Sequence, residues 1–138
     1  MWFPRAVYHG LHALTVLAEQ PPGALLNGPQ TVEALDVPRK YVLKALQRLA
    51  DAGVLHSRRG PGGGYALARP AGQVTLLDVV RAIDPDFLAA PAERGGRADP
   101  SLVRLGAEVA ESAAAVLARW TLADCLAAEG RPTTKRGK

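Results

Sequence analysis

The chain has 138 residues, of which 48% are hydrophobic and 22% charged, and its formal net charge is +4 at pH 7. This length fits one domain with an appendage, and the hydrophobic fraction suffices for an ordinary core, which excludes disorder throughout. A single cysteine excludes a disulfide framework and a zinc site built from several cysteines of one chain. No apolar run approaches the roughly 20 residues that span a bilayer, and residues 1–5 do not resemble a signal peptide. We therefore expect a cytoplasmic protein with no membrane partner.

The positive charge is concentrated in two segments. Residues 38–60 contain six basic residues and one acid, and the last eight residues contain four more basic residues. Between residues 70 and 130 the sign reverses, with nine acids against five arginines. The net charge alone is weak evidence for a nucleic-acid partner. A basic segment that joins a helix to a glycine-rich turn is stronger evidence.

Three helices are predicted in the first 52 residues. Apolar residues at helical spacing predict a helix that begins at Pro4 and ends before the Pro21-Pro22-Gly23 segment. A second, short helix is predicted over residues 27–35, where Asn27 and Gln30 form a possible capping box. A third helix over residues 38–52 is predicted to bury Val42, Ala45, Leu46 and Leu49.

The next segments predict a wing. Two helices joined by a tight turn, the second of them basic, indicate a helix-turn-helix. Residues 54–58 and 65–69 have the pattern of short strands on either side of a glycine-rich turn, which predicts a β-hairpin. A fourth helix is predicted to begin at Thr75, with Asp78 at the capping-box position. The expected fold class is therefore mainly α with a small β-hairpin wing, that is, a winged helix-turn-helix.

The C-terminal part is predicted to mediate dimerisation. Ser101 is the predicted cap of a final long helix, in which about 20 residues at 1.5 Å each form a rod of about 30 Å. A small winged domain covers only part of such a rod, so we expect the apolar stripe of the helix to pack on the same helix of a second copy in a homodimer. The predicted interface residues are Leu102, Leu105, Val109, Val116, Leu117 and Trp120.

The predicted organisation has four parts. Residues 1–84 form the winged helix-turn-helix domain, and residues 85–100, which are rich in proline, glycine and alanine, form a loop. Residues 101–128 form the dimerisation helix and a terminal turn capped by Thr121. Residues 129–138 are expected to be a disordered basic tail.

The basic helix and the hairpin together are the strongest candidate site. A recognition helix needs long donors on its outward face to reach base edges and phosphates. A wing needs a basic tip and a backbone bare enough to approach a groove, and an arginine there can enter a narrow minor groove. The predicted DNA contacts are Arg39, Lys40, Tyr41, Lys44 and Arg48 of the helix and Arg58, Arg59, Gly62 and Gly63 of the wing.

Other chemistry has less support in the sequence. His9 and His12 lie one turn apart, a spacing that can bind a metal, but ordinary surface or dimer-contact histidines fit the pattern better. Cys125 is expected to be a small buried hydrophobe, with a redox thiol as the alternative. The glycine-rich turn lacks the Gly-Lys-Ser/Thr ending of a phosphate loop. No nucleophile–base pair and no close carboxylate pair stands out, so we predict neither an enzyme nor a bound cofactor.

A long motif spans the wing and reads Leu55-x-Ser57-x-Arg59-Gly60-Pro61-Gly62-Gly63-Gly64-Tyr65-x-Leu67-Ala68-Arg69-Pro70. With this motif, and with the segments 77–83 and 121–124, the chain resembles the Rrf-two (Rrf2) family of bacterial winged-helix transcription regulators. The resemblance implies a homodimer on a near-palindromic double-stranded DNA operator, with the helix in the major groove and the wing in the minor groove. It assigns DNA contacts by position to Arg39, Lys40, Tyr41, Lys44 and Arg59.

One departure from the family bears on sensing. Many members bind an iron–sulfur cluster through three cysteines in the loop before the dimer helix, whereas residues 85–106 here contain no cysteine and no histidine. We therefore expect a DNA-binding repressor without a cluster, whose activity is set by a small-molecule effector, a protein partner or Cys125. A redox or metal sensor of the same fold, using His9, His12 or Cys125, is one alternative. A winged-helix adaptor that binds protein is another.

Overall fold

The structure is a computed structural model that describes residues 2–89 and 99–128, so the predicted tail at 129–138 lies outside the described residues. Within that part the chain is mainly helical and contains a two-stranded antiparallel sheet, which confirms the predicted fold class. Its elements in chain order are α1 (Arg5–Ala18), α2 (Gly28–Glu33), α3 (Arg39–Asp51), β1 (Leu55–Arg58), β2 (Gly64–Leu67), the 3-10 helix η1 (Ala71–Gln73), α4 (Leu76–Ile83), the 3-10 helix η2 (Pro85–Leu88), α5 (Pro100–Arg119) and α6 (Leu122–Ala128).

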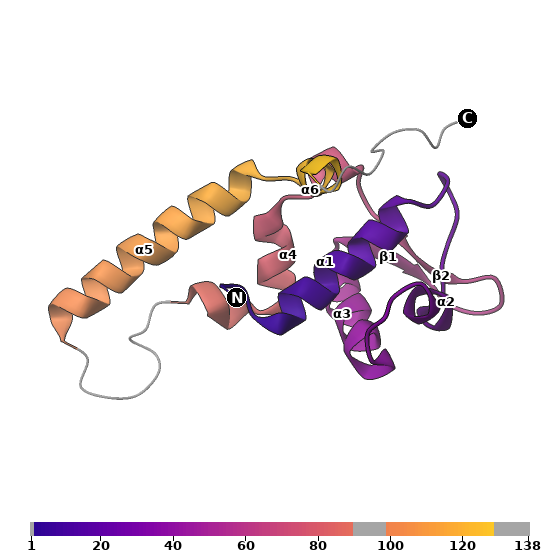
Figure 1. The fold of residues 1–138 in the computed structure, drawn as a ribbon, viewed down its shortest axis with the longest axis horizontal. Helices are drawn as coiled ribbons and strands as arrows, with labels where there is room; N and C mark the ends of the chain where they lie inside the picture. Colours follow the sequence, from indigo (N-terminus) through magenta and orange to yellow (C-terminus); the bar gives the residue numbers. More distant parts are fainter. Residues whose placement is uncertain (1, 90–98, 129–138) are drawn as a thin grey trace.

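Helices α1, α3 and α4 pack around one hydrophobic core (Figure 1). The close approach of α1 to α4 depends on Gly10, because a Cβ at that position would lie 2.9 Å from Cδ1 of Ile83. Burial of each large aliphatic side chain stabilises the fold by about 1.5–3 kcal/mol relative to its exposure. The apolar stripe predicted for α3 is confirmed as buried, namely Val42, Ala45, Leu46 and Leu49. Helix α4 buries a stripe of its own: Leu76, Val79, Val80 and Ile83.

Capping boxes fix the starts of α2 and α4, as predicted. The side chain of Asn27 accepts a hydrogen bond from the backbone N–H of Gln30 at 2.8 Å, and the Gln30 side chain accepts one from the Asn27 N–H at 2.9 Å. Thr75 and Asp78 exchange the same two bonds at 3.0 and 3.1 Å. These side chains satisfy backbone donors that the first turn of a helix leaves unpaired.

The wing is the antiparallel pair of β1 and β2, in which Leu55 pairs with Leu67 and Arg58 with Gly64. A third segment pairs with its outer edge, since Leu26 and Tyr65 exchange two backbone hydrogen bonds of 2.7 and 3.1 Å. Because Leu26 directly precedes the cap of α2, this pairing ties the wing to the helix-turn-helix.

The start of α5 differs from the prediction. Asp99, not Ser101, is the cap, and its carboxylate accepts a hydrogen bond from the Ser101 N–H at 2.8 Å. Pro100 occupies the first helical position, where its missing N–H leaves no bond unmade. The segment 85–88, which is part of the predicted loop, forms η2 and packs against α4 and α5, while residues 90–98 lie outside the described residues.

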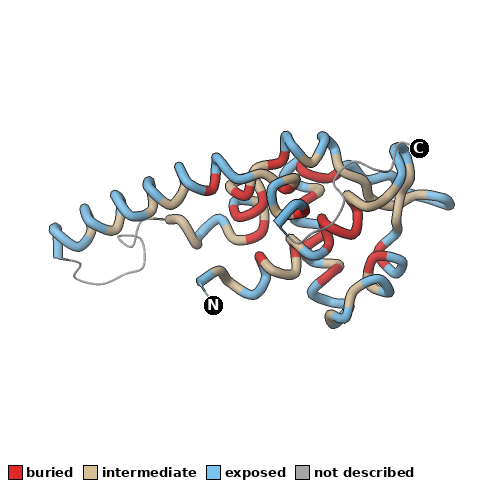
Figure 2. The backbone as a smooth tube through the Cα atoms, turned by 45° about the horizontal axis from the view of Figure 1, so that its top comes forward, coloured by how far each residue is buried: buried red, intermediate tan, exposed pale blue. Residues whose placement is uncertain are grey.

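Helix α5 extends away from the winged domain and returns to it at its C-terminal end (Figure 1). Figure 2 shows that most of its length is exposed and that it becomes buried near α6. α6 then spans the residues predicted for the terminal turn, and Thr121 and Asp124 form the predicted cap, with Asp124 N–H donating to the Thr121 hydroxyl at 3.2 Å. No helix in the described ranges is long and apolar enough to cross a membrane.

Candidate nucleic-acid interface

The outward face of α3 presents a row of long polar side chains. Lys40, Lys44 and Gln47 are exposed and follow one another at spacings of four and three residues, which places them on one side of the helix. That side lies opposite the buried stripe that packs in the core. Lys40 and Lys44 are predicted site residues, whereas sequence reasoning missed Gln47. Its position seven residues, or two helical turns, after Lys40 would have placed it on the same face of the helix. The Gln47 amide donates to Asp51 at 2.8 Å, and such an amide can pair with the edge of an adenine.

Tyr41 lies at the side of this row and connects α3 to α1. Its ring stacks on the imidazole of His9 with the centroids 5.3 Å apart and the planes 15° apart. The ammonium of Lys40 lies 5.0 Å from the centre of the same ring, a cation–π geometry that restricts where this lysine points. Burial lowers the pKa of His9, and the nearby charges of Arg5 and His12 lower it further. The imidazole is therefore held neutral at neutral pH, so that it adds no charge to this surface.

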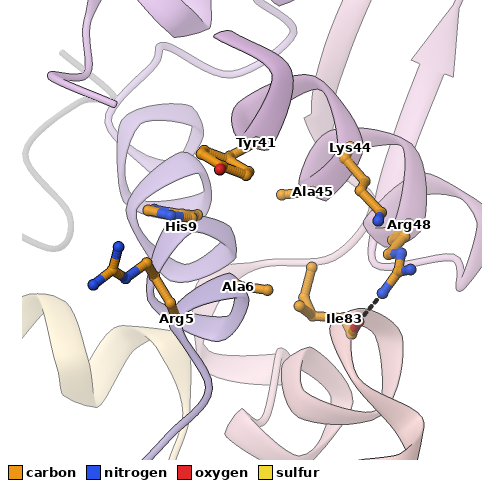
Figure 3. A pocket seen from close by; sticks show the side chains of 8 residues that line it. All are labelled: Arg5, Ala6, His9, Tyr41, Lys44, Ala45, Arg48 and Ile83. Carbon is orange, nitrogen blue, oxygen red and sulfur yellow. Dashed lines mark hydrogen bonds between the residues drawn. The ribbon is translucent and has the colours of Figure 1, made fainter. Parts of the chain in front are cut away.

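Arg39 and Arg48 lie at opposite ends of α3 and differ in their surroundings. Arg39 is exposed at the first helical position. Arg48 is exposed, but its guanidinium donates a hydrogen bond to the backbone carbonyl of Ile83 at the end of α4, so this side chain is tied to its own domain (Figure 3). Of the five residues predicted on this helix, Tyr41 and Arg48 therefore make contacts to other helices of the same chain.

A polar groove of about 650 Å³ separates α3 from the wing. It brings together the exposed Arg58 and Arg59 of the hairpin and Gln47 of α3. Three further polar residues line it that sequence reasoning missed, namely Asn27, Gln30 and Ser57. Asn27 and Gln30 were identified only as a helix cap, and nothing in the local sequence signals that the cap faces the wing.

The geometry of the hairpin turn itself requires glycine at several positions of the wing. Gly60 and Gly62 have φ values of 92° and 74°, a region that residues with a Cβ rarely adopt. A Cβ on Gly63 would lie 2.2 Å from the carbonyl oxygen of Arg58. Because the turn already requires glycine at both positions, the presence of Gly62 and Gly63 is no evidence for contact with DNA, and their predicted approach to DNA stays a prediction.

The predicted dimer surface is exposed along α5, with one exception. Leu102, Leu105 and Val109 are 65%, 55% and 57% exposed, and Val116 and Trp120 are exposed as well. Leu117 is only 6% exposed and belongs to the core of its own chain, which leaves little of it for a second copy. An apolar groove runs between α5 and the aromatic side chains of Trp2 and Phe87, whose ring centroids are 5.0 Å apart.

The candidate sensor residues lie on two helices, His9 and His12 on α1 and Cys125 on α6. His9 packs against Tyr41, and Cys125 is half-buried on α6 against the core. In the described part of the chain no group of three or more histidine, cysteine, aspartate or glutamate residues is close enough to hold a metal ion.

A basic recognition helix, a β-hairpin wing and a groove between them define a winged helix-turn-helix protein of the DNA-binding class. The family model for Rrf2, described as "Iron-dependent Transcriptional regulator", matches residues 4–128, and the chain belongs to this family. Its members are transcriptional regulators, which agrees with the prediction from the wing motif.

Solved structures share the fold at low sequence identity. CymR of B. subtilis, the global cysteine regulator, is 22% identical with a TM-score of 0.68, and the match covers 91% of this chain and 96% of that one. IscR of T. potens is 22% identical with a TM-score of 0.70 over 96% and 92% of the two chains. CymR of Staphylococcus aureus is 22% identical with a TM-score of 0.65 over 88% and 95%.

The residues of this chain do not fit a cluster held by three cysteines of one protomer. Cys125 is the one cysteine of the sequence, and it lies on α6 packed against the core, beyond the loop before α5. The acidic residues on either side of residues 90–98 are Asp84, Asp86 and Asp99. Their carboxylates offer oxygen ligands, whereas iron–sulfur clusters prefer thiolates.

Proposed function

We propose that the protein is a sequence-specific transcriptional repressor that binds double-stranded DNA as a homodimer and works without an iron–sulfur cluster. Lys40, Lys44 and Gln47 read base edges in the major groove, where lysine suits guanine and glutamine suits adenine. Arg39 at the start of the helix contacts backbone phosphate. The protein acts on nucleoid DNA in the cytoplasm.

The observation that carries this proposal is the groove between α3 and the wing. Arg58 and Arg59 line its wing side and Gln47 its helix side, with Lys44 one turn earlier on the same helix face. With basic side chains on both sides of the groove, α3 can occupy the major groove of DNA while the hairpin tip contacts the adjacent minor groove. The short backbone pairing between Leu26 and Tyr65 holds the two parts in a fixed relation.

The homodimer follows from the exposed apolar stripe of α5. A row of large aliphatic side chains that the chain itself leaves exposed favours burial against an identical row, related by a two-fold axis. A two-fold dimer also presents two recognition helices, which fits a near-palindromic operator.

The test begins with a duplex selected from a random library by the purified protein. Fluorescence anisotropy then compares this duplex with a scrambled one at two salt concentrations. We expect tight binding to the selected duplex alone, with an affinity that falls steeply with salt because phosphate contacts release counterions. Equal, weak binding to both duplexes contradicts a sequence-specific regulator.

The double variant Arg58→Ala/Arg59→Ala separates this proposal from a protein-binding adaptor. We expect it to weaken binding to the selected duplex, whereas an adaptor would lose no affinity for nucleic acid. A promoter–reporter assay then tests repression, since deletion of the protein should raise transcription from a promoter that carries the selected site.

A further inference from the structure

A cavity of about 240 Å³ lies between α1, α3 and α4, apart from the groove beside the wing. Figure 3 shows its lining: His9 and Tyr41 on one side, Ala6 and Ile83 at the base, and Lys44 and Arg48 at the α3 edge. The proposed function does not use this cavity, although all three helices that form it contribute to the core and one of them, α3, is the recognition helix.

The lining combines aromatic, aliphatic and cationic groups. The stacked rings of His9 and Tyr41 offer flat apolar surface, and Ala6 and Ile83 add aliphatic surface. No acidic residue is among the residues that line the cavity. In Figure 3, Lys44 and Arg48 extend toward the same edge, while the guanidinium of Arg5 lies on the outer side of α1.

One detail indicates a site prepared for a polar ligand atom. The hydrogen bond from Arg48 to the carbonyl of Ile83 fixes the guanidinium at the cavity edge and leaves further N–H groups for another acceptor.

The size of the cavity limits the ligand to about one ring. An apolar cavity of about 150 Å³ holds a benzene molecule, whereas pockets for drug-sized ligands range from about 300 to 1,000 Å³. A volume of about 240 Å³ therefore accommodates one aromatic ring with a small substituent.

We propose that this cavity binds a small aromatic carboxylate, with its ring against Tyr41 and His9 and its carboxylate on Lys44 and Arg48. Carboxylate pairs well with a fixed guanidinium, because the hydrogen bonds are charge-assisted. Among the chemistries that fit the volume, an aromatic anion is the one that matches both the rings and the cations.

The ligand regulates the protein through Lys44. This lysine lines the cavity and also belongs to the outward row of α3, so an ammonium held by the ligand is withdrawn from DNA. Binding of the ligand and binding of DNA then oppose each other, and the coupling is reciprocal. This regulatory step rests on the proposed function, whereas ligand binding itself does not.

The first experiment titrates benzoate into the full chain, labelled with ¹⁵N and without DNA, and follows the amide resonances by NMR. We expect saturable shifts centred on Ala6, His9, Tyr41 and Ile83. Benzyl alcohol, a neutral molecule of similar size, should bind about tenfold more weakly, which corresponds to about 1.4 kcal/mol. Inorganic phosphate should not reproduce the shifts at the two rings. Shifts of equal size with phosphate would mean a general anion site, such as one for DNA phosphate, and would overturn the proposal.

Two matched variants control this experiment. Ala6 is exposed on α1, so Ala6→Leu fills the cavity from its side without cutting into the core. Ala107→Leu makes the same change at an exposed position on α5. Benzoate binding should be lost in Ala6→Leu, retained in Ala107→Leu, and reduced in Arg48→Met to the level of benzyl alcohol. Absence of saturable shifts in the wild-type chain, or equal binding in Ala6→Leu, overturns the proposal.

The second experiment measures affinity for the selected duplex with and without benzoate. We expect saturating benzoate to weaken DNA binding about fivefold or more in the wild-type chain and to leave it unchanged in Ala6→Leu. If benzoate binds but does not change the affinity for DNA, the regulatory step is overturned, while the assignment of the cavity as a ligand-binding site still stands. A chain that binds benzoate and no DNA contradicts the proposed function instead, so the two failures are distinguishable.

Discussion

Thr75 and Thr121 face each other in an isolated antiparallel bridge, and each of them also caps the helix that follows it. The N–H of Leu76 donates to the carbonyl of Trp120 at 2.9 Å, and the N–H of Leu122 donates to that of Val74 at 2.8 Å. Two segments that lie about 45 residues apart in the sequence are thus joined at the point where α5 returns to the winged domain. This junction therefore sets the direction in which α5 projects from the domain.

Removal of either threonine side chain should destabilise the protein. We expect Thr75→Ala and Thr121→Ala each to lower the free energy of unfolding by about 1 kcal/mol, since each removes a helix cap. Urea denaturation followed by circular dichroism measures this. Ser101→Ala is the control, because Asp99 caps α5, and it should change stability by less than about 0.5 kcal/mol. A loss at Ser101 as large as the loss at the threonines contradicts this assignment of the cap.

The wing should be sensitive to a methyl group at Gly64. This residue has a φ of 148°, and a Cβ there would lie 2.5 Å from the carbonyl oxygen of Leu26. We expect Gly64→Ala to destabilise the protein by about 1–3 kcal/mol and to weaken DNA binding, because the backbone must shift. Thermal unfolding and anisotropy measure the two effects. Gly72→Ala is the matched control, since a Cβ on Gly72 would meet no atom within 4 Å.

Lys44 and the basic C-terminal tail should affect DNA binding differently. Lys44→Ala should cost about 1–3 kcal/mol on the selected duplex and change the preferred base, because the side chain reads a base edge. Truncation after Gly130 removes four basic residues, and it should weaken binding to all duplexes alike and reduce the salt dependence. Competition assays with selected and random duplexes measure both. Identical losses on the two duplexes for both changes would count against this division of roles.

The exposed stripe of α5 should determine the oligomeric state. Leu105→Glu places a charge in the centre of the proposed interface, and we expect it to convert the dimer to a monomer because burial of an unpaired charge is costly. Ala107→Glu is the control, since this exposed residue lies on another side of α5. Sedimentation equilibrium checks the masses. A wild-type chain that is monomeric at high concentration refutes the proposed homodimer.

The stability of the domain should depend on pH through His9. Burial and the charges of Arg5 and His12 lower its pKa in the folded chain, so the unfolded chain binds more protons once the pH falls below the ordinary value of about 6.5. The free energy of unfolding should therefore decrease as the pH falls from about 7.5 through 6.5 toward the folded pKa. This decrease should be smaller in His9→Phe. An NMR titration provides a second check, because Arg5→Gln should raise the pKa of His9, and an unchanged pKa contradicts the charge effect.

Elements whose formation depends on neighbouring residues were predictable from the sequence. The stripe of α3, the capping boxes at Asn27 and Thr75 and the hairpin all follow from periodicity, short-range side-chain bonds and glycine. The cap of α5 is the exception. Asp99 and Ser101 are both good cap residues, and Pro100 at the first helical position decides in favour of Asp99.

The candidate site was predictable only in part. The charges of Lys40, Lys44, Arg58 and Arg59 and the wing motif indicate DNA binding without any coordinates. Gln47 lies on the same helix face and is recognisable by spacing. Asn27, Gln30 and Ser57 are not recognisable in this way, because their place in the groove depends on how the α2 cap lies against the wing.

The family, the order of the elements and the basic character of α3 and the wing are readable from the sequence, because each of these is encoded within a short stretch of chain. Three other features arise from packing: Leu117 belongs to the core, Arg48 bonds to Ile83 and a cavity opens beside Tyr41. Each of these depends on which side chains from distant segments meet when α1, α3, α4 and α5 pack. That outcome follows from the shapes of many side chains together, and no local pattern records it.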